Sequence, residues 1–180
     1  MKNRVLFRIL PVSLAILGVV ACDVPSALTS GEAAPSAPRS EVKSAEHDML
    51  KAVRQATARY NSMVQAARAG YAGDDQCVEH PDLGGMGYHW VNFGLVDDQF
   101  DPLRPEALLY AQVSGGNVRL VGVEYVVVDV EQDAPVFGDQ AFDVGGAPLP
   151  FAHWTLHVWL YEDNPSGIFA PFNPRVSCPG

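Results

Sequence analysis

Histidine and glutamate side chains that could hold a metal ion or a polar ligand are scattered through the chain. The candidates are His80, His89, Glu106, Glu124 and His157. Imidazole nitrogens and carboxylate oxygens are the ligands that zinc and other first-row transition metals take. No two candidates have the spacing of a known metal-binding motif, so only the folded chain could bring them together. The sequence therefore predicts a small-ligand or metal site, with a divalent metal such as zinc as the candidate cofactor.

The alternation of residue types over 153–162 favours His157 among these candidates. Leu156 and Val158 fall on the core face of the predicted strand, and Thr155 and His157 fall on the other face. His153 and His157 would stand about 13 Å apart on one strand, at roughly 3.3 Å per residue. At most one of the two can therefore bind a given ion, and His157 is the more central.

Glu124 is a carboxylate within an otherwise apolar predicted strand. Alternation places it on one face with Leu120, Gly122 and Val126. A buried carboxylate must be paired, and Arg104 and Arg119 are the candidate cations. A glycine inside a strand indicates close approach of another group. Antiparallel pairing could bring Glu124 to His89 and His157, but without a metal these three would form an ordinary hydrogen-bonded network.

The elements that would position these residues are one long helix and several strands. Apolar residues recur at helical spacing over 41–70, which predicts a single helix of roughly 26 residues, about 39 Å long at 1.5 Å per residue. Alternating or β-branched runs predict strands, and a Pro- and Gly-rich stretch at 131–151 predicts a long loop. The predicted strands are 88–93, 107–113, 117–130 and 153–162. We expect an α+β fold in which one long N-terminal helix packs on an antiparallel sheet, joined by irregular loops.

The first residues are typical of an export signal. Lys2, Arg4 and Arg8 precede a short apolar run that is shorter than the roughly 20 residues that span a bilayer. The run ends in Val-Val-Ala-Cys, which resembles a bacterial lipobox. That resemblance implies cleavage after Ala21 and lipid attachment to Cys22. Residues 1–21 are then a signal peptide, and 22–40 are a lipidated cysteine followed by a flexible tether rich in Pro, Ser and Ala.

Charge excludes one class of partner for the remaining domain, residues 41–180. The chain has 12 Lys and Arg against 21 Asp and Glu, a net charge of −9. A nucleic-acid-binding protein needs a basic face, and this chain is acidic. Since anionic membranes repel such a domain, we expect the lipid to hold it at the membrane.

The cysteines support an extracytoplasmic location. The chain has three, and lipidation of Cys22 would leave Cys77 and Cys178. Two cysteines in an oxidising compartment favour a structural disulfide, although a reactive or metal-binding thiol is the alternative. A disulfide would close a loop of about 100 residues and fasten the C-terminus to the region after the predicted helix.

A broader resemblance covers roughly residues 55–178. The runs GYAGDDQCVEHPDLGGMGYHWVN, DPLRPEALLY, LVGVEYVV and LHVWLYEDNPSGIFAPFNPRVSC carry it. They resemble a widespread family of uncharacterised bacterial exported proteins. The resemblance implies membership of this family of exported proteins, and it implies no reaction.

Together these features predict a membrane-anchored extracytoplasmic lipoprotein that faces the periplasm or exterior from the cell membrane or outer membrane. Its predicted activity is binding of a small ligand or metal. The alternative is a structural or interaction protein of the cell envelope, without a ligand site. A metal-dependent hydrolase is a third class, which would need an open metal position and a general base.

Overall fold

The computed structural model describes residues 39–112, 117–146 and 148–179, without the side chains of residues 39, 40, 74 and 75. Residues 37–180 form one compact unit. The predicted signal peptide, Cys22 and the tether up to residue 38 lie outside the described residues. Within the described part of the chain, no helix combines the length and apolar character needed to cross a bilayer.

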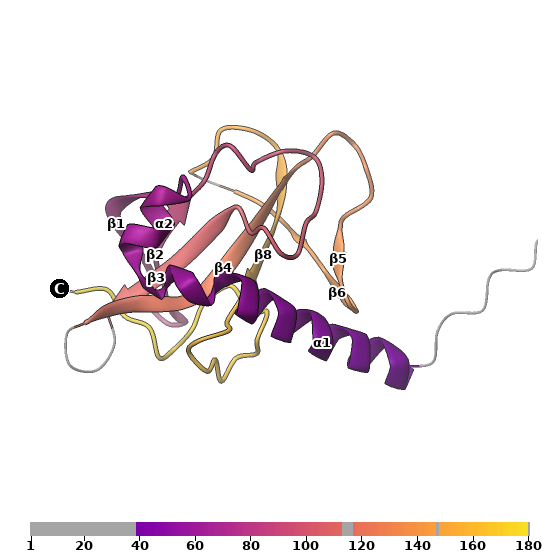
Figure 1. Cartoon of the computed structure of the whole chain (residues 1–180), viewed down its shortest axis with the longest axis horizontal. Helices are drawn as coiled ribbons and strands as arrows, with labels where there is room; N and C mark the ends of the chain where they lie inside the picture. The colour runs from indigo at the N-terminus through magenta and orange to yellow at the C-terminus, as the bar shows by residue number, and fades with distance from the viewer. Residues whose placement is uncertain (1–38, 113–116, 147, 180) are drawn as a thin grey trace, which may run out of the picture. The chain divides into compact units, whose positions relative to one another are not determined.

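A six-stranded antiparallel sheet is the centre of the fold (Figure 1). Its strands lie in the order β1-β2-β3-β4-β8-β7, so the first four are neighbours in both sequence and space. The strands are β1 (Ala72–His80), β2 (Gly84–Val91), β3 (Ala107–Gln112), β4 (Val118–Val128), β7 (Asp143–Val144) and β8 (His153–Val158). The antiparallel sheet and the helix beside it confirm the predicted α+β class. Strand β1 was not predicted from the sequence.

The predicted long loop at 131–151 contains short strands. Strands β5 (Val136–Phe137) and β6 (Gln140–Ala141) form a small separate sheet, and β7 pairs with the outer edge of β8. These pieces are two residues long, which is too short for the alternation of residue types to reveal them. They hold the segment beside the sheet, and it becomes one wall of the pocket described below.

The helical region differs from the single helix predicted over 41–70. Helix α1 (Arg39–Thr57) has 19 residues, and a 3-10 segment η1 (Ala58–Asn61) and a short helix α2 (Met63–Arg68) follow it. Figure 1 shows α1 lying along one face of the sheet.

Side-chain hydrogen bonds explain the break after Thr57. The Thr57 hydroxyl donates to the Val53 carbonyl at 2.8 Å, a local bond that commonly bends helices. The Tyr60 carbonyl accepts a hydrogen bond from the Tyr110 hydroxyl of β3. Ser62 then adopts an extended conformation, with φ −89° and ψ 109°. Apolar residues continue at helical spacing through the break, which is why the sequence predicted one helix.

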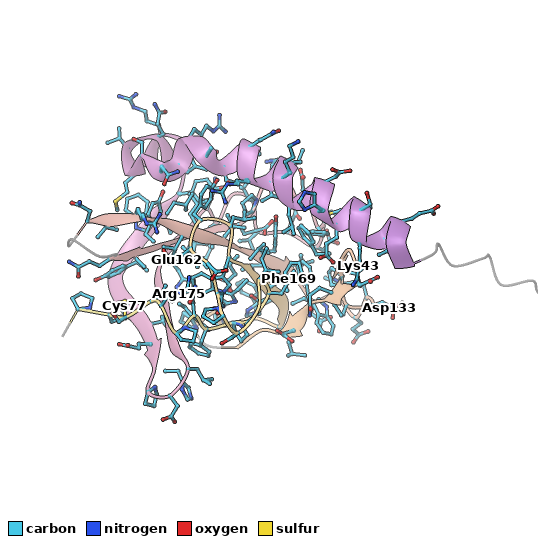
Figure 2. All side chains as sticks on the ribbon, turned by 90° about the horizontal axis from the view of Figure 1, so that it is seen from below. Lys43, Cys77, Asp133, Glu162, Phe169 and Arg175 are labelled. Atoms are coloured by element: carbon cyan, nitrogen blue, oxygen red, sulfur yellow. A yellow bond between two sulfur atoms is a disulfide. The ribbon has the colours of Figure 1, made fainter. Side chains whose placement is uncertain are left out.

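The core lies between the helical region and one face of the sheet, and Figure 2 shows side chains filling this layer. Fully buried residues there include Val53 of α1, Tyr110 of β3 and Tyr125 of β4. A smaller apolar cluster lies on the opposite face, formed by Leu109, Ala111, Val121, Trp159 and Val176. The sheet is therefore covered on both sides, by the helices on one face and partly by the C-terminal segment on the other.

A bulge in β4 changes which residues share a face with Glu124. Leu109 pairs with Gly122, but the next residue, Tyr110, pairs with Leu120, so Val121 is extra. Leu120 consequently packs in the helix-side core, whereas the sequence had placed it on the face of Glu124. The prediction for Gly122 is confirmed, because a Cβ atom there would lie 2.7 Å from the Val158 carbonyl oxygen.

The C-terminal segment is fastened to the sheet at several points. Cys77 of β1 and Cys178 form a disulfide in the structure, with Cα atoms 5.7 Å apart. The Gly85 amide donates to the Val176 carbonyl at 2.7 Å, and the Trp159 indole donates to the Ala170 carbonyl at 2.6 Å. These contacts place Pro171 beside the sheet, where it lines the pocket.

Candidate functional site

A pocket of about 620 Å³ opens on the sheet face that α1 does not cover. The centre of its floor consists of side chains from β2, β4 and β8. Its walls come from Val78 of β1, from Met86, Val91 and Val126 around that centre, from the β7 region and from Pro171. The lining residues are Gln76, Val78, Met86, His89, Val91, Glu124, Val126, Asp143, Val144, Gly146, Pro148, Leu149, His153, Thr155, His157 and Pro171.

Three of the predicted site residues meet on the pocket floor. Ligand atoms of His89, Glu124 and His157 all lie within 4.8 Å of one another. His89 Nε2 is 3.5 Å from Glu124 Oε2, and His157 Nε2 is 3.8 Å from Glu124 Oε1. The two imidazole rings contact each other edge to face, with centroids 5.8 Å apart. The arrangement is a carboxylate held between two histidines.

Strand pairing produces this cluster. Glu124 lies directly opposite His157 in the β4–β8 ladder. His89 is two strands from Glu124, and the residue of β3 opposite Glu124 is Ala107. Because neighbouring strands are about 4.8 Å apart, a bulky residue at Ala107 would separate the two side chains. His89 itself pairs with Leu109 of β3, so it approaches Glu124 diagonally across that strand.

A hydroxyl group orients the carboxylate. Thr155, two residues before His157 on the same strand face, donates a hydrogen bond to Glu124 Oε1 at 2.6 Å. His157 is 5% exposed, and its Nε2 atom is buried without a hydrogen-bond partner among the described residues. An unsatisfied buried polar atom is costly, and such atoms are uncommon in folded proteins. Coordination of a metal ion would satisfy that nitrogen.

The ionisation of the cluster suits metal binding. Burial raises the pKa of Glu124, but His157, His89 and the Thr155 hydroxyl lower it by more, so the net pKa is lowered. Burial lowers the pKa of His157, and His89 adds to this effect, while Glu124 opposes it only partly. At neutral pH the carboxylate is therefore ionised and the His157 imidazole is neutral, the states in which both residues bind metals.

The distances between the ligand atoms are somewhat longer than those around a bound metal ion. A tetrahedral zinc ion with bonds near 2 Å separates its ligand atoms by roughly 3.3 Å. The two histidine nitrogens lie 3.5 Å and 3.8 Å from different oxygens of Glu124, and the three ligand atoms lie within 4.8 Å of one another. The side chains would therefore have to move closer together to bind one ion. Two histidines and one glutamate are the protein ligands of one type of catalytic zinc site, and they leave a fourth position open. Two histidines and a carboxylate also bind iron in other proteins.

Two predicted site residues do not join this cluster, which corrects the sequence prediction. His80 lies at the end of β1, where its Nδ1 atom accepts the Asp82 amide at 3.1 Å and its ring contacts Phe172. Glu106 precedes β3 and is 2% exposed, and its Oε2 atom accepts the Val126 amide at 2.9 Å. Each is occupied by local contacts that sequence spacing does not reveal.

The sequence had offered Arg104 and Arg119 as partners for Glu124, and among the described residues neither forms an ion pair with it. Arg119 pairs with Glu162, and in the described chain the side chains within ion-pair distance of Glu124 are those of His89 and His157. The carboxylate accepts a hydrogen bond from Thr155 and lies 3.5 Å and 3.8 Å from the two histidine nitrogens.

Sequence reasoning missed Thr155 and the contribution of the β7 region. The alternation over 153–162 had placed Thr155 on the face of His157, and this was the signal that could have identified it. His153 lines the pocket but is not in the cluster, and its Nδ1 atom lies 2.9 Å from the Phe151 carbonyl. Gly145 packs directly against the His153 ring, since a Cβ atom there would lie 2.0 Å from Nε2. Asp143 and Gly145 follow an irregular stretch, and no local pattern predicted their position.

Comparison with known proteins gives no match for this chain among family models, curated proteins or solved structures.

Proposed function

We propose that this protein is a metal-binding lipoprotein of the cell envelope, and that His89, Glu124 and His157 hold a divalent first-row metal such as zinc. The observation that carries the metal site is the convergence of three ligand atoms within 4.8 Å around a buried, unpartnered His157 nitrogen. That nitrogen has no hydrogen-bond partner among the described residues, and a buried polar atom without a partner costs about 1–3 kcal/mol, which coordination of a metal would offset.

Membrane attachment is the second part of the proposal. It rests on the basic first residues, the short apolar run and the Val-Val-Ala-Cys sequence that resembles a lipobox. In this proposal Cys22 carries the lipid, the tether spans to the domain, and the domain faces the periplasm or exterior. Because an anionic membrane repels an acidic domain, only the lipid would hold the domain there. The pocket would then stay accessible to molecules in that compartment.

The metal site is tested by zinc titration of the full chain, followed by calorimetry. All variants carry Cys22→Ser, so that neither a lipid nor a free thiol contributes. We expect one zinc ion per chain. His89→Ala removes a ligand from a partly exposed position, and it should lower zinc affinity by more than the roughly 10–100-fold that loss of an outer partner costs.

His80→Ala is the matched control, because His80 lies outside the cluster. It should bind zinc as the parent chain does. If the parent binds no metal, or if His80→Ala and His89→Ala bind equally, the metal proposal is wrong. The cluster would then be a hydrogen-bonded network, as expected for a structural or interaction protein of the envelope.

A further inference from the structure

The walls of the pocket differ in chemistry from its floor. The floor has the polar cluster, whereas the walls are mostly aliphatic. The aliphatic lining residues are Val78, Met86, Val91, Val126, Val144, Pro148, Leu149 and Pro171. The volume of about 620 Å³ lies within the range of small-molecule pockets, roughly 300–1,000 Å³. A ligand that fills this pocket would place a polar group at the cluster and an apolar body against the walls.

The aliphatic character of the walls restricts that body. No Phe, Tyr or Trp side chain is among the described residues that line the pocket. Planar ligands such as nucleobases are commonly bound by stacking on aromatic side chains, which these walls do not offer. Aliphatic walls bury a hydrocarbon chain favourably, by about 0.8 kcal/mol for each methylene group. The pocket therefore fits a flexible alkyl chain better than a flat ring.

Charge restricts the polar group of the ligand. Glu124 and Asp143 line the pocket, and none of the described lining residues is Lys or Arg. Without a metal, the pocket would repel an anion. With a divalent ion bound by two neutral imidazoles and one carboxylate, the cluster gains a net positive charge and keeps an open coordination position. An anionic oxygen donor then becomes the favoured ligand.

We infer that the metal-loaded pocket binds an aliphatic monocarboxylate of medium chain length. Its carboxylate coordinates the metal held by His89, Glu124 and His157, and its chain lies against the aliphatic walls. This inference rests on the proposed metal site and names the ligand class of that site. The metal supplies the positive charge that the protein itself lacks in this pocket.

Three probes test the contributions of the alkyl chain and of the carboxylate to binding separately. Octanoate has both the chain and the carboxylate, octan-1-ol has the chain without the charge, and acetate has the charge without the chain. Calorimetry with the zinc-loaded full chain should show octanoate binding at least about tenfold more tightly than either of the other probes, as loss of a specific polar or apolar contact predicts. The metal-free chain should lose this preference. Equal binding of octanoate and octan-1-ol, or octanoate binding that does not depend on zinc, would overturn the inference.

A wall variant tests the position of the chain. Leu149 is a partly exposed residue outside the metal cluster, and Leu149→Asn replaces its apolar side chain with a polar one of similar size. Zinc affinity should stay as in the parent, while octanoate affinity falls roughly tenfold. If zinc binds but Leu149→Asn leaves octanoate affinity unchanged, the inferred chain position is wrong and the metal site stands. If zinc does not bind at all, both the metal site and its ligand are wrong.

Discussion

Glu124 and His157 face each other across strands β4 and β8, with Glu124 Oε1 3.8 Å from His157 Nε2. The nitrogen is too far from the oxygen for a hydrogen bond, and it has no other partner in the described chain. The separation is instead near the spacing of two ligands on one metal ion. In the metal site proposed above, this pair would supply two of the three ligands, with His89 as the third.

Removing the hydroxyl of Thr155 should weaken metal binding without removing a ligand. Thr155→Val has the same shape but cannot donate to Glu124 Oε1, so the carboxylate loses its fixed orientation. We expect zinc affinity to fall by about 10–100-fold, the usual effect of losing an outer-shell partner. Zinc titration measures this change. Thr155→Ser, which retains the hydroxyl, should restore most of the affinity, and equal affinities for Val and Ser would show that the hydrogen bond has no role.

Glu106 should make stability depend on pH. Burial raises its pKa from 4.5 to about 8, and Asp97 and Asp101 add to this increase, against two backbone hydrogen bonds that lower it. Tyr71 and Tyr125 also face it. The folded chain thus holds this proton more tightly than the unfolded chain. Its contribution to stability is complete below pH 4.5 and is lost as pH rises to about 8, by up to roughly 1.4 kcal/mol per pH unit.

Glu106→Gln tests this pH dependence, because it keeps an oxygen for the Val126 amide and cannot ionise. The free energy of unfolding of the variant should rise relative to that of the parent as pH increases through this interval. Urea unfolding at several pH values measures the difference. Glu131→Gln changes an exposed glutamate and should show no such trend. Parallel curves for Glu106→Gln and the parent would contradict the prediction.

The disulfide should be a major source of stability. Cys77 and Cys178 are separated by 101 positions, so their bond closes most of the domain into one loop. Cys178→Ser should lower the free energy of unfolding by about 2–5 kcal/mol. Urea unfolding under non-reducing conditions measures this loss. Peptide mapping of the parent without reduction should recover the two cysteines in one linked pair, and recovery of both as free thiols would disprove the bond.

Lipid attachment should depend on Cys22 alone. Cys22→Ser removes the sulfur to which the lipid would be joined, so labelled fatty acid should enter the parent chain and not the variant. Cys178→Ser serves as the control and should retain the label. Incorporation of label into Cys22→Ser would show that the lipobox interpretation is incorrect.

Local patterns in the sequence were enough to locate the first helix and the strands β2, β3, β4 and β8. Alternation correctly assigned Leu156 and Val158 to the core and His157 to the opposite face, because side chains of a strand point to alternate sides. The mid-strand position of Gly122 also correctly indicated close approach of another group, which is the Val158 carbonyl. These features depend only on residues near one another in the chain.

The tertiary structure decided which of these residues meet. Strand order placed His89, Glu124 and His157 on adjacent parts of one face, and it directed His80 and Glu106 to other surroundings. Alternation fixes a residue's face but not its neighbours on other strands, since those depend on pairing between distant segments. The Val121 bulge and the Tyr110–Tyr60 hydrogen bond act in the same way, because each changes a local pattern through a contact between segments far apart in the sequence.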